Sequence, residues 1–291
     1  MVDHRTCDVL VRSEALLGEG PRWCSARAAL LWLDIDAGLL HVTDPAGRDA
    51  THAIGAGVGV LAPRGDGTVA LARRAGFDVA ALDGTPPRPL APIPSAGDEV
   101  MNDGACDPAG RFWAGTYAEG ERPGGGRLYR LDPDGAVHTV LRGVTLSNGI
   151  GWSPDHRVMY YVDSATQAID TFAFDVATGT IAERRPWVRI APEDGLPDGL
   201  AVDDDGAVWI ALWGGSAVRR YTPGGRLDRV VAIPADHVTA CAFGGRDGRT
   251  LYVTTAAAYI APGDRAHQPL AGSLFAVDAG VGGPPAHVLP A

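Results

Sequence analysis

The sequence lacks the features that mark several classes of protein. It has no cluster of Lys and Arg that could follow a phosphate backbone, and its formal net charge is −10, so we expect no nucleic-acid partner. No apolar run approaches the roughly 20 residues that a membrane-spanning helix requires. The amino-terminal residues M-V-D-H-R-T-C contain no apolar signal core, so we expect a cytoplasmic protein without a membrane partner.

Several kinds of catalytic and metal-binding motif are also missing. The four cysteines form no C-x-x-C pair, which argues against a cysteine zinc site. Cys106 and Cys241 lie in apolar segments, where we expect reduced core residues. The sequence has no G-x-S-x-G element of a serine hydrolase and no cluster of histidines. The 39 Gly and 22 Pro recur at fixed places, which indicates tight turns rather than disorder.

What the sequence does contain is one short pattern that returns six times. In each copy an apolar strand is followed by a turn rich in Asp, Pro and Gly, and then by a second apolar strand. The first strands contain Glu19, Val58, Asn102, Ser147, Pro197 and Thr239. The second strands are centred on Trp32, Ala70, Trp113, Tyr161, Trp209 and Tyr252. Because these centres are 38 to 48 residues apart, the pattern predicts a β-propeller.

A third and a weaker fourth strand follow in each copy, so we predict an all-β, six-bladed propeller with four antiparallel strands in each blade. The repeat runs nearly from end to end, and we therefore predict a single domain over residues 1–291. The amino-terminal strand that begins at Cys7 should supply the outer strand of the last blade, which closes the ring and covers a sheet edge. A β-sandwich or another number of blades remains an alternative.

The inner strands of the predicted blades carry polar residues at equivalent points. These residues are Glu19, Asn102 with Asp103, Asn148, Asp198 and Thr239, whereas the second blade has Val58 or Gly59. A propeller brings the matching ends of its inner strands to one central channel, so these side chains should meet. Carboxylate and amide oxygens suit a hard divalent cation such as Ca²⁺. Taken singly, N-D-G, S-N-G and P-D-G are also ordinary turn sequences, and Glu19 could be a solvated loop carboxylate.

The same segments carry a resemblance to a known family. L-G-E-G-P-R-W at Leu17, M-N-D-G-A-C-D-P at Met101, L-S-N-G-I-G-W at Leu146 and L-P-D-G-L-A-V-D at Leu196 resemble the gluconolactonase/regucalcin (senescence marker protein)/LRE-like family. The resemblance implies one divalent metal in the central channel, either Ca²⁺ or one of Zn²⁺, Mn²⁺ and Mg²⁺. It also implies metal ligands at Glu19, Asn148 and Asp198, with Asn102 and the adjacent Asp103 near the substrate.

The resemblance implies a metal-dependent lactonase that opens a sugar-type or related lactone, and we assign Asp198 as the general base. Val100 stands where the family often has a substrate-binding Arg, so we expect a less polar substrate than gluconolactone. The position of a further substrate-binding acid maps onto Glu119, Gly120 or Glu121. His237 could contact substrate or lie in a surface loop.

Three alternative functions stay open: hydrolysis of a non-sugar ester or phosphoester, a step on a secondary metabolite, or non-catalytic binding of calcium or a small molecule. In each case we expect a small-molecule partner and a monomer or weak homo-oligomer.

Overall fold

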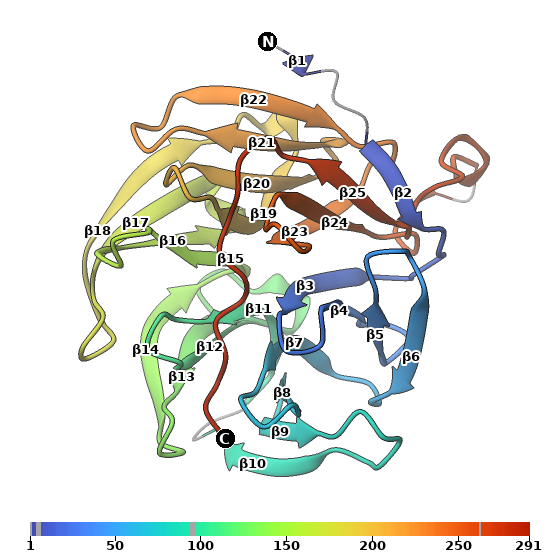
Figure 1. The fold of residues 1–291 in the computed structure, drawn as a ribbon. Helices are drawn as coiled ribbons and strands as arrows, with labels where there is room; N and C mark the ends of the chain where they lie inside the picture. Colours follow the sequence, from blue (N-terminus) through green and yellow to red (C-terminus); the bar gives the residue numbers. More distant parts are fainter. Residues whose placement is uncertain (1, 4–6, 94–96, 262) are drawn as a thin grey trace.

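Six β-sheets are arranged in a ring around a central channel, as the repeat predicts (Figure 1). The structure is a computed structural model and describes residues 2–3, 7–93, 97–261 and 263–291. Each sheet is a blade whose strands run antiparallel from the channel to the periphery. The innermost strands are β3, β7, β11, β15, β19 and β23.

The first three blades follow one another along the chain. Blade 1 contains β3 (Gly18–Cys24), β4 (Ala29–Asp34), β5 (Leu39–Thr43) and β6 (Asp49–Ala53). Blade 2 contains β7 (Val58–Pro63), β8 (Val69–Arg73), β9 (Gly76–Ala80) and β10 (Arg88–Pro92). Blade 3 contains β11 (Glu99–Cys106), β12 (Phe112–Ala118), β13 (Gly126–Leu131) and β14 (Val137–Val144).

The other three blades complete the ring. Blade 4 contains β15 (Ser147–Trp152), β16 (Val158–Asp163), β17 (Ala168–Asp175) and β18 (Thr180–Arg189). Blade 5 contains β19 (Leu196–Val202), β20 (Val208–Trp213), β21 (Ala217–Tyr221) and β22 (Leu227–Ala232). Blade 6 contains β23 (Val238–Gly244), β24 (Thr250–Thr255), β25 (Leu274–Asp278) and β2 (Cys7–Val11).

The amino-terminal strand closes the ring as predicted. Strand β2 pairs antiparallel with β25, with Cys7 opposite Val277, so the last blade is built from both ends of the chain. A second pairing was not predicted: β1 (Val2–Asp3) runs parallel to β22 and adds a fifth strand to blade 5. Both pairings cover backbone groups that an edge strand would otherwise leave open.

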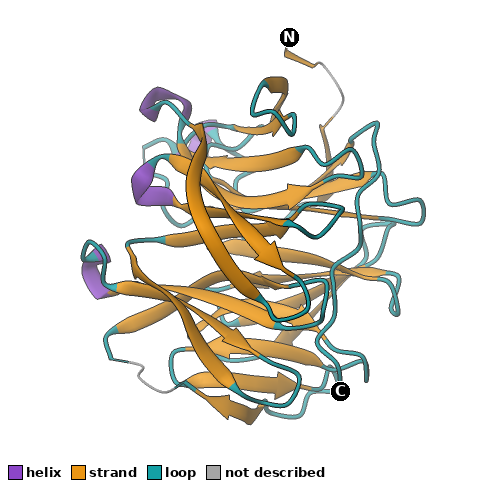
Figure 2. Cartoon of the chain, turned by 90° about the vertical axis from the view of Figure 1, so that its left-hand side faces the viewer, coloured by secondary structure: helices purple, strands orange, loops and turns teal. Residues whose placement is uncertain are grey.

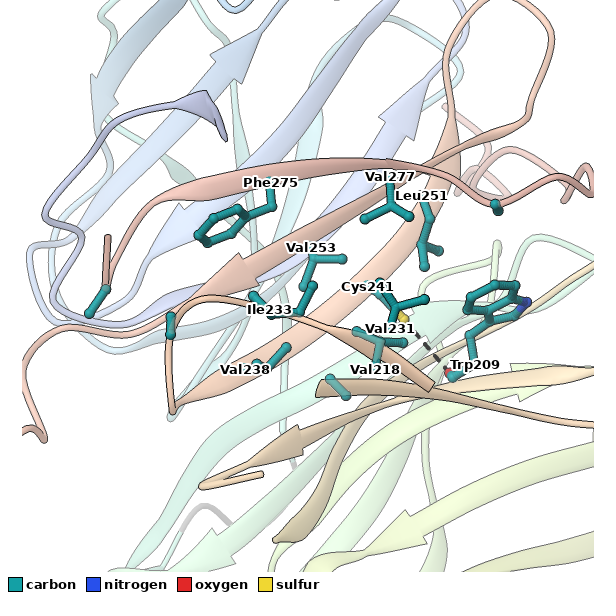
Figure 3. Close-up of a cluster of buried hydrophobic side chains, with 14 of the residues drawn as sticks. Trp209, Val218, Val231, Ile233, Val238, Cys241, Leu251, Val253, Phe275 and Val277 are labelled. Carbon is teal, nitrogen blue, oxygen red and sulfur yellow. Dashed lines mark hydrogen bonds between the residues drawn. The ribbon is translucent and has the colours of Figure 1, made fainter. Parts of the chain in front are cut away.

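The core lies between neighbouring blades, where their apolar faces meet. The cluster between blades 5 and 6 contains Trp209, Val218, Cys241 and Phe275 (Figure 3). Cys24, Cys106 and Cys241 are buried, Cys7 is half-buried, and all four thiols are free. The six residues predicted to centre the second strands are buried.

In two of the predicted turns an aspartate is hydrogen-bonded to a buried tryptophan of the core. Asp107 and Asp203 each begin a turn and accept backbone N–H groups within it. The other carboxylate oxygen accepts the indole N–H of the tryptophan on the next strand at 2.9 Å, Trp113 in blade 3 and Trp209 in blade 5. The D-x-x-G turns therefore fix the hairpin and also satisfy a buried indole donor.

Every inner strand is interrupted by a β-bulge, and this feature positions the polar residues. In each case one extra residue of the inner strand faces the second strand. The bulges lie between Glu19 and Arg22, Val58 and Val60, Met101 and Gly104, Ser147 and Ile150, Pro197 and Leu200, and Val238 and Ala240. The N-D-G, S-N-G and P-D-G segments therefore lie inside strands and are not connecting turns. A bulge changes the direction of a side chain, which can turn the polar residues toward the channel.

The two ends of the channel are covered differently (Figure 2). One side carries four short 3₁₀ helices, η1 (Glu119–Glu121), η2 (Ser164–Thr166), η3 (Pro192–Asp194) and η4 (Arg265–His267). On the other side the carboxy-terminal segment crosses the ring (Figure 1) and is joined to β7 by a hydrogen bond from Leu289 N to Pro63 O. None of the helices in the described ranges has the length and apolar character needed to span a bilayer.

Candidate active site

A cavity of about 260 Å³ lies on the side of the ring that carries the 3₁₀ helices. Its polar wall is formed by Glu19, Asn102, Glu121, Asn148, Ser164 and Asp198. Its apolar and aromatic wall is formed by Leu17, Leu146, Leu196, Tyr117, Trp213 and Tyr259. The structure therefore brings Glu19, Asn102, Asn148 and Asp198, which come from four blades, to one cavity.

A chain of hydrogen bonds fixes the two amide side chains of the cavity. Ser164 Oγ donates to the carbonyl of Pro197 at 2.6 Å and accepts from Asn148 Nδ2 at 2.7 Å. Asn102 Nδ2 donates to Asn148 Oδ1 at 2.9 Å and to the carbonyl of Ser147 at 2.7 Å. The amide nitrogens of Asn102 and Asn148 thus point into the protein, and the Asn102 oxygen and the second lone pair of the Asn148 oxygen can serve the cavity.

Neighbouring inner strands approach so closely around the channel that the residues after Asn148 and Asp198 must be glycine. A Cβ atom on Gly149 would lie 2.7 Å from the carbonyl oxygen of Asp198. A Cβ atom on Gly199 would lie 2.5 Å from the Cβ of Ala240. The glycine that follows Asn148 and Asp198 is therefore explained by backbone packing around the channel.

The carboxyl groups of the site are buried together, and this raises their pKa values. Burial raises the pKa of Glu19 to about 8; the charge of Asp103 adds to this rise, whereas the N–H of Gly20 and the charge of Arg22 oppose it. Burial also raises the pKa of Asp198 well above its usual value, and the charges of Glu19 and Asp103 act in the same direction. Glu19 and Asp198 are 8% and 6% exposed, so water screens them little.

Beneath these groups an ion pair lies inside the channel. Arg22 Nη2 contacts Asp103 Oδ1 at 3.3 Å and also donates to the carbonyl of Gly104. Burial raises the pKa of Asp103, and the Arg22 charge counteracts this. The guanidinium balances one of the three buried carboxyl groups, so Glu19 and Asp198, when ionised, add two further negative charges.

The residues present fit one divalent cation. A dication would neutralise Glu19 and Asp198, and the Asn148 amide oxygen is already oriented as a third oxygen donor. All three are hard ligands of the kind that Ca²⁺ and Mg²⁺ prefer. Across the described ranges no three His, Cys, Asp and Glu side chains form a metal-binding group, so a cation here would depend on the amide of Asn148 and on water.

Four other predicted site residues do not line the cavity. Asp103 is paired with Arg22 below it. Val100 lies on β11 opposite Tyr117, and Tyr117 forms the wall at that point. Glu119 is a partly exposed residue that pairs with Arg74 at 2.6 Å, whereas Glu121 lines the cavity. His237 stacks on Trp213 with the ring centroids 4.1 Å apart, so it supports the wall from behind.

Two residues of the site carried little signal in the sequence. Ser164 follows the second strand of blade 4 and could be taken for a turn residue, yet its hydroxyl orients Asn148. Tyr259 lies in the long connection between β24 and β25, outside the repeat pattern. Its hydroxyl donates to Asp36 at 3.2 Å and its ring meets Trp213 edge-on at 5.4 Å. Such contacts between distant segments cannot be read from periodicity.

The chain is similar in sequence to a known family and to several of its members. Residues 17–257 match the model of the SMP-30/Gluconolactonase/LRE-like region. The chain is 36% identical over 275 residues to the "Putative sugar lactone lactonase YvrE" of Bacillus subtilis (strain 168), with 93% of this chain and 94% of that protein covered. It is 35% identical over 269 residues to regucalcin of Oryctolagus cuniculus, with 89% and 90% covered.

A solved structure has the same fold over nearly the whole chain. The crystal structure of a calcium-binding protein, regucalcin, from Agrobacterium tumefaciens superposes with a TM-score of 0.93 at 27% identity and covers 98% of this chain and 97% of that one.

Proposed function

The chain belongs to the SMP-30/gluconolactonase/LRE-like family, and from this premise we propose that it is a lactone hydrolase that depends on one divalent cation. The observation that carries the proposal is the meeting of Glu19, Asn102, Asn148 and Asp198 in one cavity. A relative covering almost the same length bears the name of a sugar lactone lactonase. Ca²⁺ is our first choice of cation, because the donors are all oxygen atoms.

Glu19, Asn148 and Asp198 would hold the cation. When bound, it would polarise the lactone carbonyl and lower the pKa of a water molecule. Glu19 and Asp198 would then be ionised, because the cation compensates for the burial that raises their pKa values. Ser164 keeps the Asn148 oxygen directed at the site through the contact at 2.7 Å.

Asp198 would serve as the general base. It takes a proton from water as the water oxygen bonds to the carbonyl carbon of the lactone. The ring C–O bond then breaks, and the proton held by Asp198 passes to the ring oxygen, which leaves as a hydroxyl group. The sum is one lactone and one water converted to one hydroxy acid. Asn102 presents an acceptor oxygen that can position the water or a substrate hydroxyl, since both its N–H groups are engaged.

Hydrolysis of a phosphoester is less well supported than hydrolysis of a lactone. Sites that transfer phosphoryl groups stabilise the charge of the phosphate oxygens with metal ions together with Arg or Lys. Among the described residues that line this cavity, none is basic. A carbonyl ester, which develops one negative charge next to the cation, suits this lining better.

The proposal is tested with chelator-treated protein and a simple δ-lactone. Acid release should be absent after chelation and should return with one of Ca²⁺, Zn²⁺, Mn²⁺ or Mg²⁺. The Asp198→Asn variant should retain cation binding, because an amide oxygen can coordinate, but lose about 10²–10⁴-fold in turnover, because it cannot accept a proton. Equal activity with and without chelator, or wild-type turnover by metal-loaded Asp198→Asn, would contradict the assignment.

A further inference from the structure

Each of the three proposed cation ligands is preceded in the sequence by a leucine. Leu17, Leu146 and Leu196 each stand two residues before a ligand, in the segments L-G-E, L-S-N and L-P-D. Leu17 and Leu146 stand just before β3 and β15, Leu196 begins β19, and all three leucines line the cavity. We call them the leucine collar. The three leucines are more exposed than the buried ligands, so the collar lies in the outer part of the cavity.

The aromatic side chains of the lining form a wall beside the leucines, since Tyr117 pairs with Leu146 and Trp213 pairs with Leu196. Tyr117, Trp213 and Tyr259 form this aromatic wall. Trp213 is stacked on His237 at 4.1 Å and meets Tyr259 edge-on at 5.4 Å. The hydroxyl of Tyr259 is engaged with Asp36 at 3.2 Å. The wall therefore offers mainly ring surface to a bound molecule.

The charged side chains in the described lining of the cavity are all acidic. Beyond the proposed ligands the lining contributes the carboxylate of Glu121, and Asp36 stands behind Tyr259. No basic side chain occurs among the described lining residues. Arg22 is paired with Asp103 below the site, and Arg73 is held by Asp78 at 2.7 Å and by the carbonyl of Ala56. An anionic group in the outer part of the cavity would face the carboxylates of Glu121 and Asp36.

From these observations we propose that the collar and the aromatic wall form a subsite for an uncharged aromatic or branched alkyl substituent on the lactone ring. The proposal rests on the proposed function, since the lactone carbonyl must lie beside Glu19, Asn148 and Asp198. The substituent packs against Trp213 and the adjacent leucines, and the apolar surface that becomes buried is removed from water. Lactones that carry a phosphate or carboxylate in its place are rejected.

The subsite also explains why few hydroxyl groups can be recognised. A site discriminates strongly for a hydroxyl only when it offers hydrogen-bonding groups that would otherwise remain unpaired. Outside the ligands the lining offers Asn102, Glu121 and the Tyr117 hydroxyl, because the Tyr259 hydroxyl has a partner and Ser164 is used within the wall. A polyhydroxylated ring would leave several of its hydroxyls without partners.

The test compares three δ-valerolactones, one unsubstituted, one with a phenyl group and one with a carboxylate, on the metal-loaded protein. We expect kcat/KM for the phenyl compound to exceed that of the unsubstituted one about 10- to 100-fold, mainly through KM, and the carboxylate compound to be the poorest. In Trp213→Ala the phenyl preference should fall to within about threefold of unity. Trp187→Ala is the control, because Trp187 is a half-buried tryptophan on β18 away from the cavity.

Binding of the phenyl-substituted δ-lactam, measured by calorimetry, separates this proposal from the proposed function. The lactam reports the subsite without turnover. Binding that Trp213→Ala weakens, with no lactone hydrolysed, would uphold the subsite and refute the hydrolase. Hydrolysis of all three lactones at similar kcat/KM, or lactam binding equal in Trp213→Ala and wild type, would overturn the subsite. A preference for the carboxylate compound would overturn it as well.

Discussion

The Ser164→Ala variant tests whether the arrangement behind the cavity matters for metal binding. The change removes one oxygen atom that never touches the cation. It leaves Asn148 Nδ2 and the carbonyl of Pro197, both now paired at 2.7 and 2.6 Å, without that partner. Asn148 is 5% exposed, so water cannot easily take the place of the hydroxyl. The amide is then held only through its oxygen, which accepts from Asn102 at 2.9 Å, so it is oriented less firmly toward the site.

The expected loss follows from the role of groups that orient metal ligands. Removing such a partner weakens metal affinity about 10- to 100-fold, which corresponds to about 1.4–2.8 kcal/mol. Leaving a buried donor unpaired also costs about 1–3 kcal/mol of folding stability. Calorimetric titration of the chelated protein with Ca²⁺ measures the first effect, and urea unfolding measures the second.

Ser153→Ala is the matched control. Ser153 is also buried, and its hydroxyl accepts from Val158 N at 3.0 Å and donates to Asp155 at 2.6 Å in the turn between β15 and β16. We expect this variant to lose stability while it binds Ca²⁺ like the wild type. If both variants lose stability equally and both retain wild-type affinity, the orienting role of Ser164 is refuted.

The remaining predictions concern the buried charges. Glu19 has its pKa raised to about 8 from 4.5, so its contribution stabilises the metal-free fold below pH about 4.5 and is lost as pH rises through about 8. The urea concentration at the unfolding midpoint of chelated protein should therefore fall between pH about 4.5 and pH about 8. The fall should be smaller in Glu19→Gln and absent at saturating Ca²⁺. A midpoint that rises with pH would contradict this assignment. Asp103→Asn should destabilise the protein by about 3–5 kcal/mol, because it leaves the Arg22 guanidinium buried without its partner. Urea unfolding checks the value, and a loss below about 1 kcal/mol would show that the pair is well solvated.

The sequence was sufficient to predict the fold and the four polar residues of the inner strands that meet in the cavity. Six strand pairs at similar spacing predict six blades, because each copy must bury its apolar faces against its neighbours. Glu19, Asn102, Asn148 and Asp198 could be aligned because they lie in the bulge of the inner strand or directly before it in four blades. Such alignment needs only the repeat and not the three-dimensional structure.

The outer layer of the site could not be predicted in the same way. Tyr259 comes from a connection that has no counterpart in the other blades, so the repeat says nothing about its position. Asp103 is adjacent to Asn102, and in a bulged strand the direction of neighbouring side chains depends on where the extra residue falls. Its contact with Arg22 joins β11 to β3, a pairing of distant segments. The parallel pairing of β1 with β22 involves two residues, too few for a recognisable pattern.

The division of the channel has a consequence for product release. The Arg22–Asp103 pair separates the cavity from a second one of about 100 Å³, which is lined by Arg22 and lies beneath Pro284 and His287 of the carboxy-terminal segment. A hydroxy acid formed beside Asp198 must therefore leave through the opening by which the lactone entered. Hydrolysis turns a neutral molecule into an anion, and that opening is bordered by Glu121 and, behind Tyr259, by Asp36. The same carboxylates that reject anionic substrates would then repel the product outward, so that it competes only weakly with the next lactone for the shared opening.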